Sequence, residues 1–332
     1  MNLPLVTILT PVYNGESFLA GCIDSVRNQQ YENWEYMIVD NCSSDSTLKI
    51  ATHYKDIDSR ITVLSNPTFV GVCENHNIAF RLVPKGSKYC KVVSADDWIT
   101  TKCIQKLVEL AETHPNVGIV GSYQQSGSEI KWKGMPVNVE VISGREVCRK
   151  SLLDNLDVFG TPTSSLYRSD LIRKTKNFFP HSFPHADTSA CYEYLQYCDY
   201  GFVHEVLSIE RVHDQQVSSA VRKLNMGVAA SLDIFLKYGP LYLTENEFKT
   251  GKKACLEQYH KWLGGCVLKM REKEFWSFHT LRLRELGYPI AWRKVIIGAM
   301  NEIADEMQNP NVAFHKLLAV LKQKFWNWSD RR

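Results

Sequence analysis

The stretch from Leu5 to Asp40, LVTILTPVYNGESFLAGCIDSVRNQQYENWEYMIVD, carries two different hydrophobic periods. Its two ends, Leu5–Thr10 and Trp34–Asp40, are short apolar runs of strand character. Between them, the apolar residues recur at helical spacing, at Phe18, Leu19, Cys22, Ile23 and Val26. Because a helix between two strands usually connects parallel neighbours, this stretch predicts an α/β fold.

The same alternation continues to about residue 122. Further strands are expected at Ile61–Ser65, Tyr89–Val93 and Val117–Ser122. Helices are expected between them, after Ser46, at Val72–Leu82 and at Thr101–His114. The pattern predicts a mostly parallel central sheet with helices on both faces.

The alternation stops near Gln124. The polar, Gly-rich stretch that follows predicts a loop or a small antiparallel excursion. Helices are expected after it at Arg145–Leu153 and Tyr192–Cys198, with a strand–helix pair between them and an alternating strand from Gly201 to His213. Beyond Ser219 the pattern is helical, with breaks at Tyr238–Pro240, Gly287–Pro289 and Asn309–Pro310. We therefore expect an α/β domain at 1–219 and a helical domain at 220–332.

Composition excludes several classes of protein. The formal net charge of +3 is too small to indicate nucleic-acid binding. The ten cysteines contain no C-x-x-C pair, and several lie in apolar helical patterns, which favours reduced thiols and a cytoplasmic protein. No window approaches eighteen apolar residues, and the first residues lack the basic region of a signal peptide.

Polar clusters follow three of the predicted strands, where ligands bind in parallel α/β sheets. They supply an aromatic ring at Tyr13, a lone carboxylate at Asp40 and a carboxylate pair at Asp96 and Asp97. A ring and a carboxylate suit a nucleobase, and a carboxylate pair suits a hard divalent cation that binds a diphosphate. The alternative is a surface loop with two solvated Asp residues, or Asp97 as the cap of the helix that starts near Thr101.

Four motifs together resemble the family 2 glycosyltransferases, which are inverting enzymes with the GT-A fold. These motifs are TPVYNGESFLAGCIDSVRNQQYENWEYMIVDNCSSDST, VGVCENHNIA, SADDW and RVHDQQVSS, and they extend over roughly two thirds of the chain. The resemblance implies a GT-A catalytic domain, a nucleotide-sugar donor and a bound Mn²⁺ or Mg²⁺.

On the donor side, the resemblance implies roles for seven residues. Pro11, Tyr13 and Asp40 would hold the base. Asn14 and Glu16 would line the donor pocket. Asn77 would support the site from its helix, and Asp96 would lie near the ribose.

At the metal, the resemblance implies Asp97 as the ligand, with His213 able to complete the shell. A histidine held by a hydrogen bond in a loop is the alternative for His213. Two departures from the family pattern are evident. Ser94 replaces a frequent Asp, and His76 replaces an Arg, which leaves a weaker, titratable cation near the phosphates or none.

On the acceptor side, the family places a catalytic carboxylate where this sequence has Asp187. The acidic neighbour that relatives often carry is Ala186 here. Asp187 also suits a helix N-cap, and the two roles are compatible. His181 and His185 are the other candidates for a general base in this region. Gly160–Arg168 either leaves room for the acceptor sugar or forms a plain turn into a strand.

The stretch 314–332 has one apolar face, formed by Phe314, Leu317, Leu318, Leu321, Phe325 and Trp328, and basic residues elsewhere. This pattern fits a helix packed on its own domain or on a second subunit of a homo-oligomer. It also fits a helix lying on an anionic membrane surface, which would place the protein peripherally on the inner membrane face.

These observations predict a cytoplasmic glycosyltransferase that moves a sugar from a nucleoside diphosphate, most often UDP in this family, to a glycan or lipid-linked glycan. Polysaccharide biosynthesis is the expected context. A nucleotidyltransferase is an alternative, although TPVYNGE lacks a Gly-rich phosphate loop. A binding-only relative is a second alternative, favoured by Ser94 and Ala186. An oxidoreductase is disfavoured, because no G-x-G-x-x-G follows the first strand.

Overall fold

A computed structural model describes residues 3–180, 184–212 and 218–308 of the chain. It divides into two compact units, unit 1 at 1–216 and unit 2 at 217–332. The division falls three residues before the boundary expected from the sequence. The residues His181, His213 and 314–332, for which the sequence suggested roles, lie outside the described ranges.

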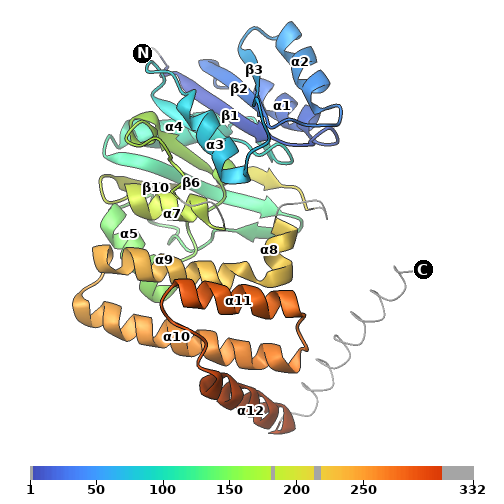
Figure 1. The fold of residues 1–332 in the computed structure, drawn as a ribbon. Helices are drawn as coiled ribbons and strands as arrows, with labels where there is room; N and C mark the ends of the chain where they lie inside the picture. The colour runs from blue at the N-terminus through green and yellow to red at the C-terminus, as the bar shows by residue number, and fades with distance from the viewer. Residues whose placement is uncertain (1–2, 181–183, 213–217, 309–332) are drawn as a thin grey trace. The chain divides into compact units, whose positions relative to one another are not determined.

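The first half of unit 1 is a parallel βα array (Figure 1). Its strands lie side by side in the order β3-β2-β1-β4 and are all parallel. In chain order its elements are β1 (Val6–Val12), α1 (Leu19–Arg27), β2 (Trp34–Asp40), α2 (Thr47–Ile57), β3 (Ile61–Ser65), α3 (Val72–Arg81) and β4 (Tyr89–Val92). These elements agree with the sequence pattern, because each strand is an apolar run and each helix keeps one apolar face.

The second half continues the sheet in the order β4-β9-β6-β10-β5, with antiparallel pairs at β4–β9, β9–β6 and β10–β5. In chain order its elements are β5 (Trp98–Ile99), α4 (Cys103–Thr113), β6 (Val117–Ser126), β7 (Glu129–Lys131), β8 (Val141–Ile142), α5 (Gly144–Asp154), the short 3₁₀ helix η1 (Pro162–Ser164), β9 (Ser165–Arg168), α6 (Ser169–Ile172), α7 (Ala186–Tyr194) and β10 (Asp199–Glu210). The result is one mixed α/β sheet with flanking helices, as the sequence pattern predicted.

The connection from β4 to β5 explains where the carboxylate pair lies. The chain leaves β4 in the middle of the sheet and next forms β5 at the edge, beside β10. Asp96 and Asp97 lie within this crossing, directly before Trp98 begins β5. The pair is therefore held between two ordered strands.

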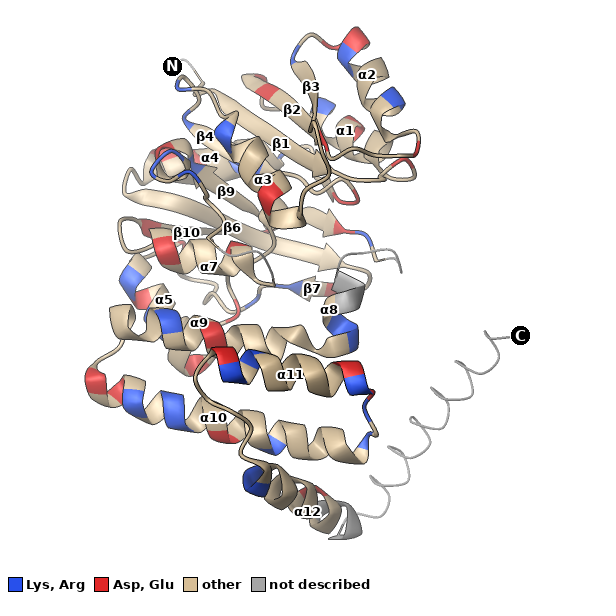
Figure 2. Cartoon of the chain, viewed as in Figure 1, with Lys and Arg blue, Asp and Glu red and all other residues tan. Residues whose placement is uncertain are grey.

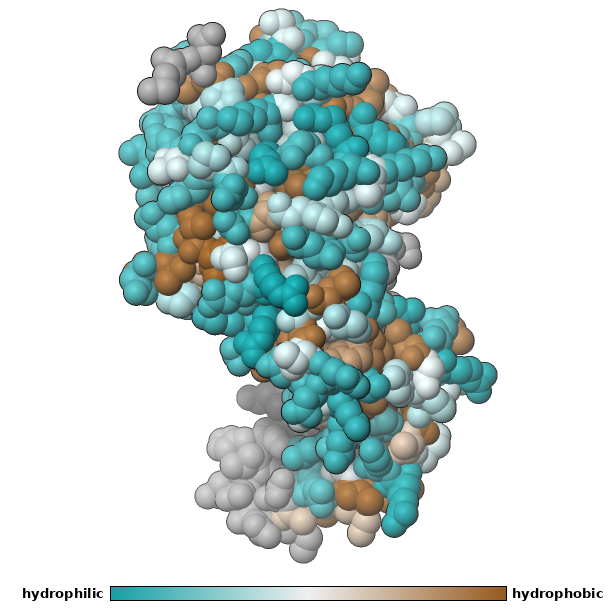
Figure 3. Space-filling model, turned by 90° about the vertical axis from the view of Figure 1, so that its left-hand side faces the viewer, coloured by the Kyte–Doolittle hydropathy of each residue, from teal (hydrophilic) through white to brown (hydrophobic). Residues whose placement is uncertain are grey.

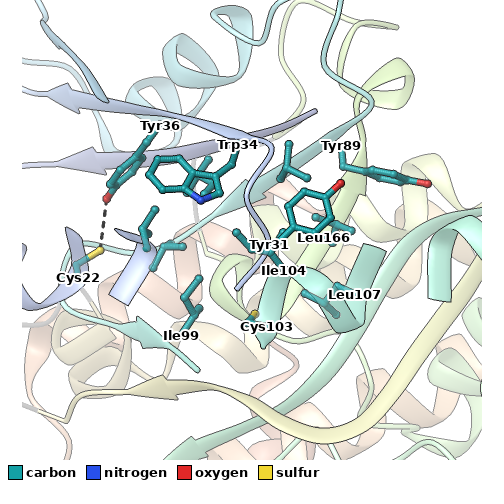
Figure 4. Packing of buried hydrophobic residues seen from close by; sticks show 14 of the residues in the cluster. Cys22, Tyr31, Trp34, Tyr36, Tyr89, Ile99, Cys103, Ile104, Leu107 and Leu166 are labelled. Atoms are coloured by element: carbon teal, nitrogen blue, oxygen red, sulfur yellow. Dashed lines mark hydrogen bonds between the residues drawn. The ribbon is translucent and has the colours of Figure 1, made fainter. Parts of the chain in front are cut away.

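The core of unit 1 fixes the strand ends that carry the site (Figure 4). The Thr10 hydroxyl of β1 donates to the Val93 carbonyl at 2.7 Å, and it lies 2.7 Å from the Tyr36 hydroxyl of β2. Cys22 of α1 lies 3.7 Å from the same Tyr36 hydroxyl. The ends of β1, β2 and β4 are thus joined through buried polar contacts, which are stronger when they are shielded from water.

Two predicted features of unit 1 can be compared in detail. The excursion expected after Gln124 is a short antiparallel pair of β6 with β7, so this prediction is confirmed. The sequence also suggested a helix at Tyr192–Cys198, and this was wrong in its limits. Helix α7 begins six residues earlier, at Ala186, because His185 takes a left-handed conformation (φ 64°) that turns the chain into the helix.

Unit 2 is helical in its described part. Its helices are α8 (Ser218–Leu224), α9 (Met226–Tyr242), α10 (Glu245–Leu268), α11 (Lys273–Glu285) and α12 (Trp292–Gln308). Helices α10 and α12 cross closely at two glycines: a Cβ added at Gly264 would lie 2.5 Å from the Ala299 backbone nitrogen. Among the helices that the structure describes in the two units, none has both the length and the apolar content needed to span a lipid bilayer.

The surface carries charges of both signs. Figure 2 shows Lys and Arg interspersed with Asp and Glu over the helices of both units. On the face shown in Figure 3, hydrophilic side chains predominate and hydrophobic ones gather in small patches.

Candidate functional site

An exposed aromatic pair lies beyond the ends of β1 and β3. Tyr13 and Phe69 are 51% and 61% exposed, and their rings meet edge to face with centroids 4.8 Å apart. Large aromatic rings are usually buried, so an exposed pair indicates a surface for a flat ligand. The sequence predicted Tyr13 here, whereas Phe69 was missed because a single Phe in a loop carries no motif signal.

Asp40 lies beside this pair. It ends β2 directly opposite Val12 of β1, and Pro11 is paired with Val39 one step earlier. The Asp40 side chain is buried, and its two oxygens accept long hydrogen bonds of 3.3 Å from the Ser43 N–H. A buried carboxylate with such weak partners keeps the capacity to accept a further N–H donor.

Asn14 and Glu16 hold the loop between β2 and α2. The Asn14 backbone is left-handed (φ 49°), and its side-chain oxygen accepts a hydrogen bond of 2.9 Å from the Ser44 N–H. Glu16 Oε2 accepts one of 2.8 Å from the Ser46 N–H. Both side chains are exposed and engaged with this loop, so they shape the edge of the site. Contact of either residue with a donor stays a prediction.

Buried amides support the same loops from below. Asn66 Nδ2 donates to the side-chain oxygens of Asn41 at 2.9 Å and Asn75 at 2.8 Å. Asn41 in turn pairs with the backbone of Val70 through both of its amide atoms. The network ties the ends of β2 and β3 to α3. Sequence reasoning missed it, because the three residues are far apart in the chain.

Asp97 is the more enclosed member of the carboxylate pair. Its side chain is 5% exposed, and Oδ2 accepts a hydrogen bond of 2.7 Å from the Thr163 hydroxyl. Burial, and then the charge of Asp96, raise the pKa of Asp97 to about 7. Without a cation, the pair therefore carries a charge that the surrounding protein does not fully stabilise.

Two residues from distant parts of the chain hold this motif. The Thr163 hydroxyl oxygen accepts the Ser94 N–H at 3.1 Å while its proton goes to Asp97. Arg211, at the end of β10, donates its backbone N–H to Asp97 Oδ1 at 3.4 Å. The Arg211 guanidinium lies 4.9 Å from the centre of the Trp98 ring. The sequence suggested neither contact, since both depend on how β9 and β10 are placed in the sheet.

The donor chemistry of this motif fits a divalent cation. Oxygen ligands from two adjacent carboxylates are what Mg²⁺ and Mn²⁺ prefer, and each Asp97 oxygen keeps a further lone pair. Within the described ranges, no cluster of three or more His, Cys, Asp or Glu side chains suited to a metal is present. The predicted third ligand, His213, lies outside those ranges.

Asp187 lies in the first turn of α7, and the N-cap position is occupied by His185. The suggested N-cap role of Asp187 is therefore wrong, although its carboxylate accepts a hydrogen bond of 2.8 Å from the Thr188 N–H. Burial raises the pKa of Asp187, while the Thr188 N–H and the neighbouring His185 and His76 oppose that shift. A carboxylate with a raised pKa is a stronger base than an exposed one.

Helix α3 supports the segment that leads to Asp187. The Asn77 amide pairs with the Phe179 backbone, donating to its carbonyl at 3.1 Å and accepting its N–H at 2.9 Å. His76 Nδ1 donates to the Val72 carbonyl at 2.9 Å, and burial lowers the pKa of this histidine. The sequence left open whether His76 supplies a weak cation or none. Because its pKa is lowered, the structure favours a neutral His76 near pH 7.

The arrangement of the strand ends defines a class of protein. An aromatic ring and a carboxylate follow β1 and β2, and a carboxylate pair follows β4, as in nucleotide-dependent sugar transferases with the GT-A fold. The sequence model described as "Glycosyl transferase family 2" matches residues 7–175, half of the chain. The chain belongs to glycosyl transferase family 2.

Curated proteins that resemble the chain are named glycosyltransferases. An uncharacterized glycosyltransferase of Haemophilus influenzae is 27% identical over 199 residues, which cover 56% of this chain and 58% of that protein. The putative teichuronic acid biosynthesis glycosyltransferase TuaG of Bacillus subtilis is 33% identical over 110 residues, 33% of this chain and 43% of TuaG. The chain thus spans less than two thirds of these relatives' length.

Solved structures share the fold. Residues 1–349 of S. aureus TarS, in complex with UDP-GlcNAc, superpose with a TM-score of 0.57 at 14% identity, covering 77% of this chain and 72% of that one. The mannosyltransferase PcManGT from Pyrobaculum calidifontis, in complex with GDP-Man and Mn²⁺, gives a TM-score of 0.54 at 14% identity, covering 92% and 89%. At this level of identity the likeness concerns the fold alone.

Proposed function

We propose that the chain is an inverting glycosyltransferase that uses a nucleoside-diphosphate sugar, with UDP as the first nucleotide to test. One observation carries the proposal: the half-buried Asp96 and the buried Asp97 follow β4 at the carboxyl ends of the parallel strands, where Asp40 and the Tyr13–Phe69 rings also lie. Domain 1–219 would be catalytic. The cytoplasm, where nucleotide-sugars are made, is the proposed location, and polysaccharide synthesis the proposed context.

Recognition of the donor would begin at the base. A ring bound against Tyr13 and Phe69 would present its N–H edge to Asp40, whose carboxylate accepts long hydrogen bonds from the Ser43 N–H. Pro11 would form the floor of this part of the site. Asp96 would accept a ribose hydroxyl. Asn14, Glu16 and Asn77 would keep the surrounding loops in place.

The diphosphate would lie beside Asp97. Asp97 would hold Mn²⁺ or Mg²⁺ together with phosphate oxygens, and His213 would complete the set of ligands. The bound cation would supply the charge that neutralises the leaving diphosphate. Asp97 itself is held by Thr163 and Arg211, so its oxygens need no rearrangement to serve as ligands.

The acceptor would be a glycan or a lipid-linked glycan. Its hydroxyl oxygen would attack C1 of the donor sugar from the face opposite the diphosphate, which inverts the configuration there. The hydroxyl proton would pass to the Asp187 carboxylate, and the bond from C1 to the diphosphate oxygen would break. Burial of Asp187 supports this role, because its raised pKa strengthens it as a proton acceptor.

A thermal-shift screen tests the proposal. Among UDP-GlcNAc, UDP-glucose and GDP-mannose, each with and without Mn²⁺, a donor that binds should raise the melting temperature, and the shift should grow with the logarithm of its concentration over Kd. Donor hydrolysis in the absence of acceptor would then separate an active enzyme from a binding-only relative. A nucleotidyltransferase would instead release pyrophosphate from a nucleoside triphosphate. Absence of any nucleotide-dependent shift would contradict the proposed function.

We further propose that the C-terminal region meets an anionic lipid surface that carries the acceptor. The support is the outer face of α12, where five large apolar side chains are 44–63% exposed: Trp292, Ile296, Ile297, Met300 and Ile303. The basic and apolar stretch 314–332 follows this helix in sequence. Sedimentation with phosphatidylglycerol vesicles should therefore depend on residues 309–332. Equal recovery of full-length and truncated protein, or a concentration-dependent dimer instead, would reject lipid as the partner.

A further inference from the structure

A lysine side chain is completely buried inside the sheet of unit 1. Lys91 lies in β4, in the otherwise apolar run YCKVV, and its side chain has no exposed surface. In the described ranges it makes no ion pair with a carboxylate. Transferring an ammonium from water into a protein core without a partner is costly, so a lysine in this position requires a compensating structural role.

The ammonium is held by main-chain carbonyls. Lys91 Nζ donates to the Thr163 carbonyl, to the Ser165 carbonyl at 3.1 Å and to the Val92 carbonyl at 3.3 Å. An ammonium has three N–H donors, and these three carbonyls use all of them. A neutral amine would have only two donors and would turn a lone pair toward a carbonyl oxygen.

Two of the three carbonyls belong to the segment that supports the carboxylate pair. Thr163 is in η1 and Ser165 begins β9, which pairs with β4 so that Lys91 lies opposite Leu166. The Thr163 side chain then reaches Asp97 and Ser94. Lys91 holds the backbone of Thr163, and the hydroxyl of Thr163 holds Asp97.

We propose that Lys91 is a positioning residue for Asp97: it fixes the Thr163 backbone so that the Thr163 hydroxyl holds the carboxylate ready to bind a divalent cation. The inference rests on the proposed function of Asp97 as the metal ligand. Removing a residue that orients a metal ligand usually lowers metal affinity about 10–100-fold. Within the part of the chain that the structure describes, no side-chain hydrogen bond joins Pro11, Tyr13 or Asp40 to Lys91, Thr163 or Asp97, so nucleotide binding without metal should not depend on this relay.

The test measures binding of UDP, or of GDP if UDP does not bind, by calorimetry with and without MnCl₂. Lys91→Met should lower the affinity gained on adding Mn²⁺ by about 10–100-fold, and leave metal-free affinity within about twofold. Thr163→Val, which keeps the shape and removes the hydroxyl, should give the same selective loss. Thr163→Ser keeps the hydroxyl and should behave as wild type. The double variant Lys91→Met/Thr163→Val should lose no more than either single one.

A matched control separates positioning from general destabilisation. Val92→Ala removes buried volume from the next position of β4 and keeps the backbone carbonyl that accepts a hydrogen bond from Lys91. It should keep the Mn²⁺-dependent gain at temperatures where it is folded. Should Lys91→Met fold too poorly to measure, Thr163→Val and Thr163→Ser decide the question.

The outcomes distinguish this inference from the function on which it depends. If wild type gains no nucleotide affinity from Mn²⁺, the metal role of Asp97 and the role of Lys91 both fail. If wild type shows the gain and Lys91→Met or Thr163→Val keeps it in full, only the positioning role is wrong. Equal losses with and without Mn²⁺, or the same loss in Val92→Ala, would also overturn it.

Discussion

Replacing Asp97 by Asn should stabilise the metal-free protein while removing its affinity for metal. Asp97 is almost completely buried beside Asp96, and its pKa is raised from 3.8 to about 7. Asn has nearly the same shape, and its side-chain oxygen can still accept the Thr163 hydroxyl. The substitution therefore removes the buried charge and retains the main contact.

The sign and size follow from proton linkage. A folded-state pKa above the unfolded value means that the folded protein binds more protons than the unfolded chain. The stability that wild type gains from protonated Asp97 is therefore complete below about pH 4 and is lost as pH rises through about 7. The full difference corresponds to about 4 kcal/mol at 1.36 kcal/mol per pKa unit. Between pH 5 and pH 8 the advantage of Asp97→Asn over wild type should grow by about 2.5 kcal/mol.

Urea unfolding at pH 5, 6, 7 and 8, without divalent metal, measures this difference. Adding Mn²⁺ to the UDP complex at pH 8 should stabilise wild type further and leave the UDP complex of Asp97→Asn unchanged, because Mn²⁺ binds only the ionised carboxylate. Asp96→Asn serves as a control: it removes only the neighbouring charge, so its advantage should be smaller. A pH-independent difference between Asp97→Asn and wild type, or a variant less stable than wild type at pH 8, would refute the reasoning.

Three further predictions concern other parts of the chain. Asp40→Asn should lower UDP affinity roughly ten- to hundredfold with its metal dependence intact, since a charge-assisted hydrogen bond contributes about 1.5–3 kcal/mol; calorimetry measures this, and unchanged affinity places Asp40 outside the site. Asp187→Asn should bind donor normally and lose about 10²–10⁴-fold in turnover; a wild-type rate in this variant together with an inactive His185→Ala would identify His185 as the base. His279 is buried between the Tyr259 hydroxyl and a main-chain carbonyl, and its pKa is lowered to about 4, chiefly by burial. Its stability contribution is therefore present above pH 6.5 and lost as pH falls toward 4, by about 2 kcal/mol between pH 7 and 5; urea unfolding should show this slope, and its persistence in His279→Gln would contradict the assignment.

Local sequence predicted the parallel half of the sheet because its signals are local. Each of β1 to β4 is a short apolar run, and each helix between them repeats at helical spacing. Parallel strands connected by helices bring their carboxyl ends to one edge of the sheet. The sequence therefore predicts that Tyr13, Asp40, Asp96 and Asp97 lie at the same edge. The limits of α7 were missed, because its start depends on a left-handed residue and carries no apolar period.

The partners of those residues were beyond the reach of the sequence. Thr163 and Arg211 meet Asp97 across separations of 66 and 114 residues. Phe69, in the loop from β3 to α3, meets Tyr13, in the loop from β1 to α1. The local pattern around these residues does not determine which strands are neighbours. The antiparallel insertion of β9 between β4 and β6 depends on the packing of the whole sheet.

Lys91 shows what the sequence determines and what only the tertiary structure determines. The sequence by itself determined that a lysine occupies a strand whose other residues are apolar, and that two carboxylates follow the strand. Only the tertiary structure decided that the ammonium is enclosed by three carbonyls and connected through Thr163 to Asp97. The physical reason is that strand and helix periods are set by neighbours in the chain, whereas burial and the pKa of Asp97 are set by neighbours in space.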